Sequence, residues 1–484
     1  MENSILGGLI RQLDNLVWGP ALLLLLLGSG SYLMLRLRFL PLRNLKFALK
    51  CAFGGDSPPG KNTLGKGSGR ASSGSVSSLA SLTTELATTL GIGNIIGVAM
   101  AMVLGGPGAL FWMVATSIVG MATKLVESML SVKYRGKNQK GQSAGGPMYT
   151  CLHAFPGKPG RILGTLFALL AVTASFGMGN MTQSNSIADT LWVSFRVPKA
   201  DTGLFLTILT VLVVIGGISV IGKVTQVLVP FMGVFYLLGA LAVILVHWRN
   251  LPGAVAGILT AAFHPQAVSG GIFGTVTVSA YQSLRWGVAR GIFSNEAGIG
   301  ASGITAAAAD TEDCVKQGYI SMTGVFLDTA VVCTITGLAF AVSGVLSLTD
   351  ANGAPLTGTA LTLAAFSTVL GDWGNSFVSA CIVLFAFATV IGWAYQGERA
   401  FEYLLGGSTK YNIWYRFIYG LTAFVGCVCP LEVVWNFSDI CNGLMAVPNL
   451  ICVLALSGSA CREIRAYCTG GSVHLLKYAK KELR

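Results

Sequence analysis

ATTLGIGNIIGVAMAMVLGG, residues 87 to 106, is an apolar stretch interrupted near its middle by glycines and an asparagine. It is long enough to cross a bilayer as a helix. Glycine weakens a helix by roughly 1 kcal/mol relative to alanine, so Gly91 and Gly93 favour local unwinding. Unwound backbone at membrane depth is tolerated only against protein or a water-filled cavity. Because broken helices of this kind form the substrate and ion sites of secondary transporters, the stretch predicts transport.

The composition of the whole chain is typical of a polytopic membrane protein. Of its 484 residues, 53% are hydrophobic and only 11% are charged, whereas soluble domains carry about 25% charged residues. The net charge of +12 lies in loops between apolar spans, which argues against nucleic-acid binding. The cysteines and histidines have no zinc-site spacing, and no catalytic motif is present. We therefore expect neither an enzyme nor a cofactor.

Eleven apolar stretches have the length of a membrane span. They are residues 17–35, 76–104, 107–131, 161–193, 203–221, 224–247, 268–289, 317–346, 374–396, 412–430 and 440–458. The stretch at 253–263 is too short to span and lies between two prolines, so we expect a surface helix there.

The distribution of basic residues predicts the orientation. The loop at 36–74 holds eight lysines and arginines against one acid, and the loop at 132–160 and the C-terminal tail are also basic. The loop at 347–373 contains no lysine or arginine. Because basic loops stay in the cytoplasm, we expect the N-terminus outside and the C-terminus inside.

The spans suggest an inverted repeat. The second span is interrupted at Gly91 and Gly93, and the seventh, which runs in the opposite direction, carries Gly270, Gly271 and Gly274. Two interrupted, antiparallel spans five helices apart are expected from two repeats of five helices. The predicted organisation is an extra helix with a basic cytoplasmic loop (1–75), a first repeat (76–247), a second repeat (248–459) and a basic tail (460–484).

The break in the second span is a candidate binding site. The half-helix that starts near Asn94 presents unpaired N–H groups and a positive dipole end, which suit a substrate carboxylate. Carbonyl groups from Thr88 to Gly91 are suited to a cation. The alternative is that Gly91 and Gly93 only permit close helix packing.

Three amides, Asn180, Gln183 and Asn185, lie within the fourth span. Because an unsatisfied amide in hydrocarbon costs several kcal/mol, these side chains should face the bundle interior. There they either bind a polar ligand or link helices.

Further polar and aromatic residues lie inside predicted spans. Asp328 is an intramembrane carboxylate, a functional candidate whose alternative is a structural anchor. Thr389 offers a hydroxyl oxygen to sodium, and Trp393 either closes a small pocket or only packs. Lys124 and Glu127, spaced i, i+3, are expected to pair or snorkel in a mainly structural role.

Several motifs together resemble the alanine or glycine:cation symporter family. They are GIGNIIGVAMAMVLGGPGALFWM (91–113), MATKLVES (121–128), GGPMY (145–149), GNMTQSNSIA (179–188), GVARGIFSNEAGIG (287–300), LDTAVVCT (327–334) and LFAFATVIGWAYQGERAFEYLLG (384–406). They follow the family order over nearly the whole chain, and RGIFSNEAGIG is the most specific of them. The chain departs from the family pattern at Ala388, where serine is common, and at Glu85, where a small residue is usual.

The resemblance implies an all-α integral membrane protein with a leucine-transporter-type fold of five plus five inverted helices, preceded by one extra helix. It implies sodium-coupled symport of small neutral amino acids such as alanine or glycine by alternating access, in the bacterial inner membrane. The expected substrate-site residues, including the carbonyl-bearing glycines of the seventh span, are Thr89, Gly91, Gly93, Asn94, Ile95, Phe176, Gln183, Gly270, Gly271, Gly274 and Trp393. The expected sodium ligands are Thr88, Gly91, Thr389 and Asp328.

A channel or membrane receptor is the alternative class. A channel would require a repeated pore motif or a ring formed by oligomerisation, and the sequence contains no such repeat.

Overall fold

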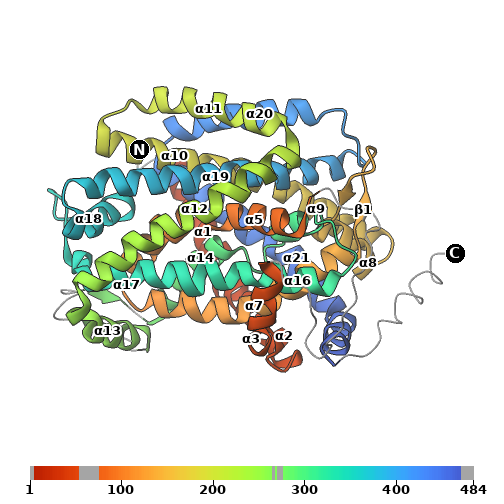
Figure 1. The fold of residues 1–484 in the computed structure, drawn as a ribbon, viewed down its shortest axis with the longest axis horizontal. Helices are drawn as coiled ribbons and strands as arrows, with labels where there is room; N and C mark the ends of the chain where they lie inside the picture. The colour runs from red at the N-terminus through yellow and green to blue at the C-terminus, as the bar shows by residue number, and fades with distance from the viewer. Residues whose placement is uncertain (1–4, 54–75, 264–266, 270–275, 279, 470–484) are drawn as a thin grey trace.

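The computed structural model describes residues 5–53, 76–263, 267–269, 276–278 and 280–469, and most of its regular structure is helical (Figure 1). Within these ranges two short antiparallel hairpins accompany the helices. β1 (Gly136–Lys137) pairs with β2 (Ser143–Ala144), and β3 (Ala267–Ser269) pairs with β4 (Val276–Val278). The predicted all-α class is confirmed.

Six helical runs in the described part of the chain are long and apolar enough to cross a membrane. They are α7 (Ala109–Lys133); Lys158–Phe195, made of α9 (Lys158–Phe176), η2 (Gly177–Met181) and α10 (Thr182–Phe195); α12 (Gly217–Val246); Cys314–Ser343, made of α16 (Cys314–Val325), η5 (Phe326–Cys333) and α17 (Thr334–Ser343); α19 (Trp373–Leu404); and Val434–Cys468 within α21 (Leu431–Cys468). Five of them overlap one predicted stretch each, and α12 overlaps two, 203–221 and 224–247.

The other described helices are shorter. They are α1 (Ile5–Val17), α2 (Pro20–Arg36), α3 (Leu40–Arg43), α4 (Leu45–Ala52), α5 (Ser78–Thr89), η1 (Ile92–Asn94), α6 (Ile96–Leu104), α8 (Pro147–Ala154), α11 (Lys199–Ile215), η3 (Trp248–Asn250), α13 (Leu251–Phe263), α14 (Ala280–Asn295), α15 (Ala301–Ala306), η6 (Val345–Ser347), α18 (Gly358–Leu370) and α20 (Asn412–Val428). α13 is the short helix expected at 253–263. α18 was not predicted, because its apolar stretch is shorter than a membrane span.

Local signals account for several helix starts. Ser77 accepts a hydrogen bond from the Ala80 N–H at the start of α5 (3.1 Å), and Asp313 accepts one from the Lys316 N–H at the start of α16 (2.8 Å). Pro20 is the first residue of α2, where its missing N–H costs nothing. Such caps satisfy backbone donors that the first helical turn leaves unpaired.

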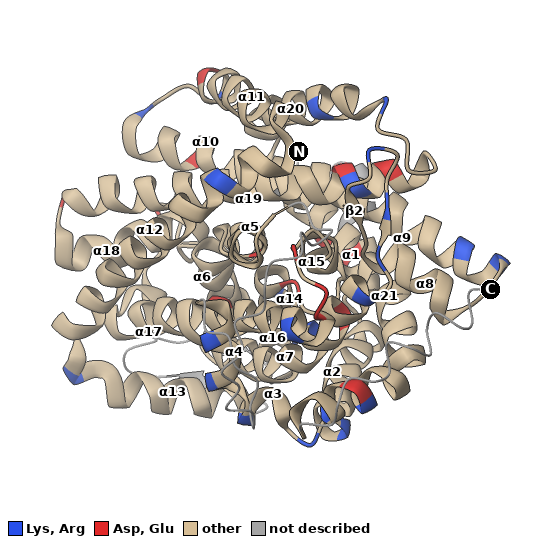
Figure 2. Ribbon diagram, turned by 45° about the vertical axis from the view of Figure 1, so that its right-hand side comes forward, with Lys and Arg blue, Asp and Glu red and all other residues tan. Residues whose placement is uncertain are grey.

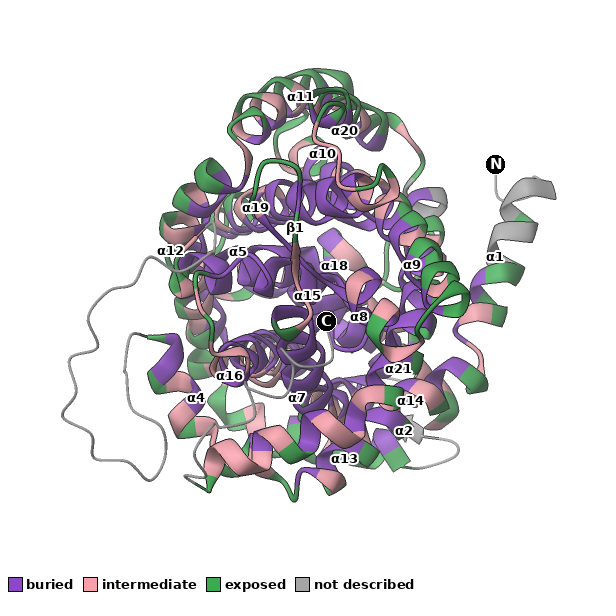
Figure 3. Ribbon diagram, turned by 90° about the vertical axis from the view of Figure 1, so that its right-hand side faces the viewer, coloured by how far each residue is buried: buried purple, intermediate pink, exposed green. Residues whose placement is uncertain are grey.

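Two broken helices cross in the middle of the bundle. α6 packs against α14, whereas α5 packs against α15, so each half of one broken helix contacts the opposite half of the other. This arrangement is antiparallel, as an inverted repeat requires. In Figure 3 the elements around the breaks, including α5, α7 and α19, are largely buried, and α11 and α20 form an outer, more exposed pair.

The second broken helix lies later in the chain than predicted. Residues 267–269 and 276–278 are strands, and α14 begins only at Ala280. The predicted span at 268–289 is therefore wrong. Its glycines, Gly270, Gly271 and Gly274, lie outside the described residues.

The break itself follows α14, at three residues with positive φ. Glu296 has φ 57°, Gly298 has φ 92° and Gly300 has φ 86°, and the helix resumes as α15 at Ala301. An α-helix cannot continue through this left-handed backbone. Hydropathy did not find the segment because Arg290 and Asn295, with Glu296, make it too polar to count as an apolar run.

Candidate functional site

The side-chain amide of Asn94 bridges the first helix break. Asn94 Oδ1 accepts a hydrogen bond from the Gly91 N–H (3.0 Å), and the Asn94 and Ile95 N–H groups donate to the Gly91 and Ile92 carbonyls, at 3.2 Å each. The N–H groups of Asn94 and Ile95, where a substrate carboxylate was expected to bind, are therefore already paired. The free donors of a helix start belong instead to the first turn of α6, from Ile96 onward.

Asp328 joins the two broken helices. Its Oδ1 accepts from Asn94 Nδ2 (2.7 Å), and its Oδ2 accepts from Ser294 Oγ (2.8 Å) and Thr329 Oγ1 (2.6 Å). The side chain is fully buried in η5, a π-helical segment, and π-turns within α-helices are frequent at functional sites. Asp328 thus lies at a junction of η1, α14 and η5, as an anchor of both breaks.

Thr389 on α19 and Gln183 on α10 contact the first break. Thr389 Oγ1 donates to the Ala87 carbonyl (3.0 Å), and Gln183 Oε1 lies 3.5 Å from the Ile92 N–H. A Cβ at Gly91 would collide with Thr389 Oγ1 and lie 3.4 Å from Gln183 Oε1. Glycine is therefore required at position 91 by this close approach.

Gly93 makes the second close approach. A Cβ there would lie 3.1 Å from Ser294 Cα on α14. Close packing, which the sequence left as the alternative for these glycines, is thus present. It also brings the polar groups of the two breaks together.

The second break is held by Glu296, which the sequence reasoning did not select. Its Oε1 accepts from Trp393 Nε1 (2.8 Å), and its Oε2 accepts from Thr88 Oγ1 (3.2 Å) and Ser302 Oγ (2.9 Å). One carboxylate thereby binds groups on α5, α15 and α19. Glu296 lies in the string GVARGIFSNEAGIG, which the sequence analysis singled out as a family motif. It was not selected because the predicted seventh span ended at residue 289 and left it outside the membrane.

Lys124 lies deep in the bundle rather than at its surface. Its Nζ is 3.4 Å from Glu85 Oε1 and donates to the Asn295 carbonyl (3.0 Å), and its side chain is fully buried. Glu127 Oε2 instead accepts from the Gly298 N–H (3.2 Å). The expected snorkelling or pairing of Lys124 with Glu127 is therefore wrong, because the second break supplies partners for both. Figure 2 shows acidic residues at the centre of the bundle beside α5, α14 and α15.

The side chains of other predicted residues bond to partners away from the breaks. Asn185 Nδ2 donates to the Gly426 carbonyl (2.8 Å) and Asn180 Nδ2 to the Tyr419 carbonyl (2.5 Å), so both amides link η2 and α10 to α20. The ring of Phe176 packs on Tyr419, with centroids 5.9 Å apart, which differs from the predicted pocket position. Thr89 Oγ1, another predicted site group, donates within its own helix to the carbonyls of residues 85 and 86.

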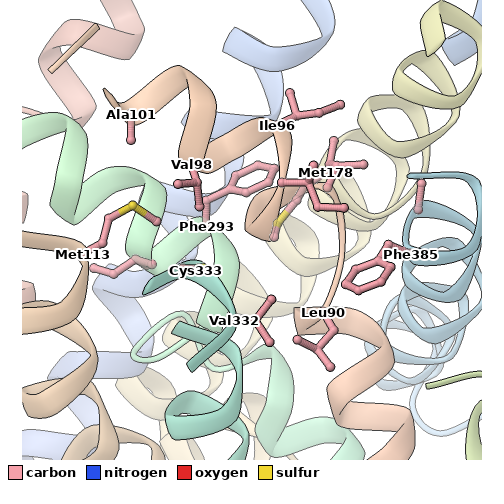
Figure 4. Close-up of a cluster of buried hydrophobic side chains, with 14 of the residues drawn as sticks. Leu90, Ile96, Val98, Ala101, Met113, Met178, Phe293, Val332, Cys333 and Phe385 are labelled. Atoms are coloured by element: carbon pink, nitrogen blue, oxygen red, sulfur yellow. The ribbon is translucent and has the colours of Figure 1, made fainter. Parts of the chain in front are cut away.

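An apolar wall surrounds the unwound segment. Figure 4 shows Leu90, directly after α5, with Met178, Phe293, Val332 and Phe385 from four other elements, and all five are buried. An apolar surround with a few fixed polar groups is characteristic of a small-molecule site.

A second charged cluster lies along α14. The Arg290 guanidinium forms an ion pair with Asp439 (Nη1 to Oδ1, 3.1 Å) and lies 5.0 Å from the Trp435 ring centroid. Arg285 Nη2 is 3.5 Å from Asp14 Oδ2, which ties α1 to α14. These contacts join α14 to α21 and to α1.

Two antiparallel broken helices that meet among polar groups in an apolar bundle define a secondary transporter of the leucine-transporter type. The fold is similar to that of MhsT, solved in complex with L-phenylalanine, with a TM-score of 0.55 and 14% identity, over 83% of this chain and 100% of that one.

The sodium:alanine symporter family matches residues 3–475, and the chain belongs to this family. It is 45% identical to the sodium/alanine symporter AgcS of Methanococcus maripaludis, over 95% of this chain and 96% of that protein. It is 36% identical to the probable sodium/glutamine symporter GlnT of Bacillus subtilis, over 96% of this chain and 91% of that protein. The protein is thus a multi-pass membrane protein of a cation-coupled amino-acid symporter family rather than of an enzyme family.

Proposed function

We propose that the protein couples the entry of sodium to the uptake of small neutral amino acids, such as alanine or glycine, by alternating access. The observation that carries the proposal is the buried carboxylate of Asp328, which bonds to both broken helices at their crossing. A group that touches both breaks is well placed to couple ion occupancy to their movement. The names of the relatives support sodium and alanine as the transported pair.

The substrate carboxylate is assigned to the N–H groups at the start of α6 and to the N–H group of Gly93. These donors and the positive helix end favour an anion. The substrate ammonium group requires acceptors, and the proposed ones are Gln183 Oε1 and backbone carbonyls of the second break. The second break takes the role that the sequence gave to Gly270, Gly271 and Gly274.

Sodium is assigned to oxygens around the first break, because hard cations take oxygen ligands. Thr389 Oγ1 and the Ala87 carbonyl, 3.0 Å apart, are the first candidates. Carbonyls of Thr88 and Gly91 are close in sequence, and Asp328 is the alternative ligand. Sodium acts here as a co-transported substrate, and the proposal includes no cofactor.

The wall of buried apolar residues and Trp393 are proposed to limit the substrate to a small side chain. We propose a bacterial inner-membrane location from the family, and the basic loops support an N-terminus outside and a C-terminus in the cytoplasm.

Proteoliposome uptake tests the proposal. An inward sodium gradient should drive radiolabelled alanine above its equilibrium level, and an equal potassium gradient or a sodium ionophore should abolish the excess. Asp328→Asn should lose this accumulation, whereas Asp350→Asn, at an exposed carboxylate, should retain it. Equilibration without accumulation in the unmutated protein would indicate a channel and reject symport.

A further inference from the structure

We propose that Glu296 is a positioning residue that determines specificity, because it holds the Trp393 indole as the floor of the substrate pocket. The inference rests on the proposed function and adds the residue that keeps the pocket small. Glu296 does not contact the substrate in this scheme. It acts through the orientation of Trp393.

The contact is direct and both partners are buried. Trp393 Nε1 donates to Glu296 Oε1 at 2.8 Å, and both side chains lie out of solvent. The other carboxylate oxygen accepts from Thr88 and Ser302. Because Thr88 and Ser302, on two other elements, also bind the carboxylate, it offers the indole one position.

The opposite side of the indole is also fixed. Gly179 in η2 lies against it so closely that a Cβ there would collide with Cβ and Cγ of Trp393. The ring is therefore confined by backbone on one side and by a hydrogen bond at its nitrogen. Removal of the hydrogen bond leaves the ring free to turn.

Trp393 lies one helical turn from the predicted site. It follows Thr389 by four residues on α19, about 6 Å along the helix, and Thr389 is the side chain that touches Gly91. Gly179 likewise precedes Gln183 by four residues. The indole thus forms the layer next to the helix break, where it sets the depth available to a substrate side chain.

The backbone of Glu296 gives independent support. Its φ of 57° is in the left-handed region, which a non-glycine residue seldom adopts and which glycine would occupy without strain. The neighbouring Asn295 Oδ1 holds the turn by accepting from the Ala297 N–H (2.9 Å). Strained residues of this kind persist where surrounding contacts fix them, often at functional sites.

The test compares how leucine and alanine compete for sodium-driven alanine uptake in proteoliposomes. The readout is the ratio of their inhibition constants, which a general loss of folded protein does not change. Glu296→Ala should improve leucine relative to alanine by about tenfold, the effect of one hydrogen bond to a charged group. Glu296→Gln, which keeps an acceptor, should change the ratio least. Ser302→Ala should change the ratio less than Glu296→Ala does, because it removes one of the other donors to the carboxylate and leaves the acceptor of the indole in place.

Trp393→Phe supplies a second measurement that does not depend on the folding of Glu296→Ala. It removes the donor and should admit leucine by itself, and adding Glu296→Ala to it should change the ratio no further. An unchanged ratio in both single variants, or additive effects in the double variant, would overturn the inference while sodium-driven alanine uptake persists. Absence of sodium-driven accumulation in the unmutated protein would instead reject the proposed function, and the inference with it.

Discussion

Replacing Thr389 with valine keeps the shape of the side chain and removes one oxygen beside Gly91. That hydroxyl lies 3.0 Å from the Ala87 carbonyl oxygen and 3.1 Å from the Phe385 carbonyl oxygen, and its one proton is available to either acceptor. A neutral hydrogen bond contributes about 0.5–1.5 kcal/mol. If the same oxygen binds sodium, a loss of this size weakens sodium binding about 2- to 12-fold, since 1.4 kcal/mol is a factor of ten.

The assay measures initial alanine uptake by proteoliposomes over a range of sodium concentrations, then the KM for alanine at saturating sodium. Thr389→Val should raise the sodium concentration for half-maximal uptake by the stated factor and change the alanine KM less. Thr389→Ser keeps the oxygen and is the control. A valine variant with unchanged sodium dependence would refute the assignment and move the ion to Asp328.

Other predictions concern topology, the substrate and pH. A cysteine introduced at Ser57 should resist a membrane-impermeant thiol reagent in intact cells, and ready labelling would reverse the proposed orientation. Alanine and glycine should compete strongly for uptake and phenylalanine about 5- to 150-fold more weakly, because overfilling a tight pocket costs about 1–3 kcal/mol; Trp393→Ala should relax this limit, and strong competition by phenylalanine against the unmutated protein would remove the small pocket. Alaninamide should hardly compete because it lacks the carboxylate, so strong competition by it would remove the helix-end site. Burial, with repulsion from Asp439, raises the pKa of Asp14 from 3.8 to about 6. The folded state therefore favours the protonated form of Asp14. The contribution of this group to the free energy of unfolding is present below about pH 4 and is lost as the pH rises through 6. Thermal unfolding in detergent should show a smaller stability change from pH 5 to pH 7.5 in Asp14→Asn than in the unmutated protein, and equal changes would contradict the assigned pKa.

The sequence predicted the long spans because a span is recognised by the length of its apolar stretch. That length can be read from consecutive residues without knowledge of distant contacts. α7 and α12, for example, overlap stretches found by hydropathy alone. The second broken helix was missed for the opposite reason. Its inner end carries Arg290 and Glu296, whose partners lie far away in sequence, so the segment looked too polar for a membrane.

The same limit applies to the site. Gly91, Asn94 and Asp328 could be selected because a polar or helix-weakening residue in an apolar span needs an explanation. The role of Glu296 depends on its hydrogen bond with Trp393, 97 residues later in the chain. Nothing local in the sequence indicates such a pairing.

The break lies between α5, of 12 residues, and α6, of nine residues. It therefore brings the C-terminal end of one helix close to the N-terminal end of the next. Each end carries about half a unit charge, negative at the end of α5 and positive at the start of α6, so together they make a strong local field with no net charge. In the proposed scheme the sodium ion lies at the negative end and the substrate carboxylate at the positive end, so each ligand matches the half of the field that the other leaves open. Every neutral α-amino acid carries the same carboxylate at its α-carbon. The field therefore favours binding of the two ligands together, and the choice among amino acids is left to the shape of the surrounding walls.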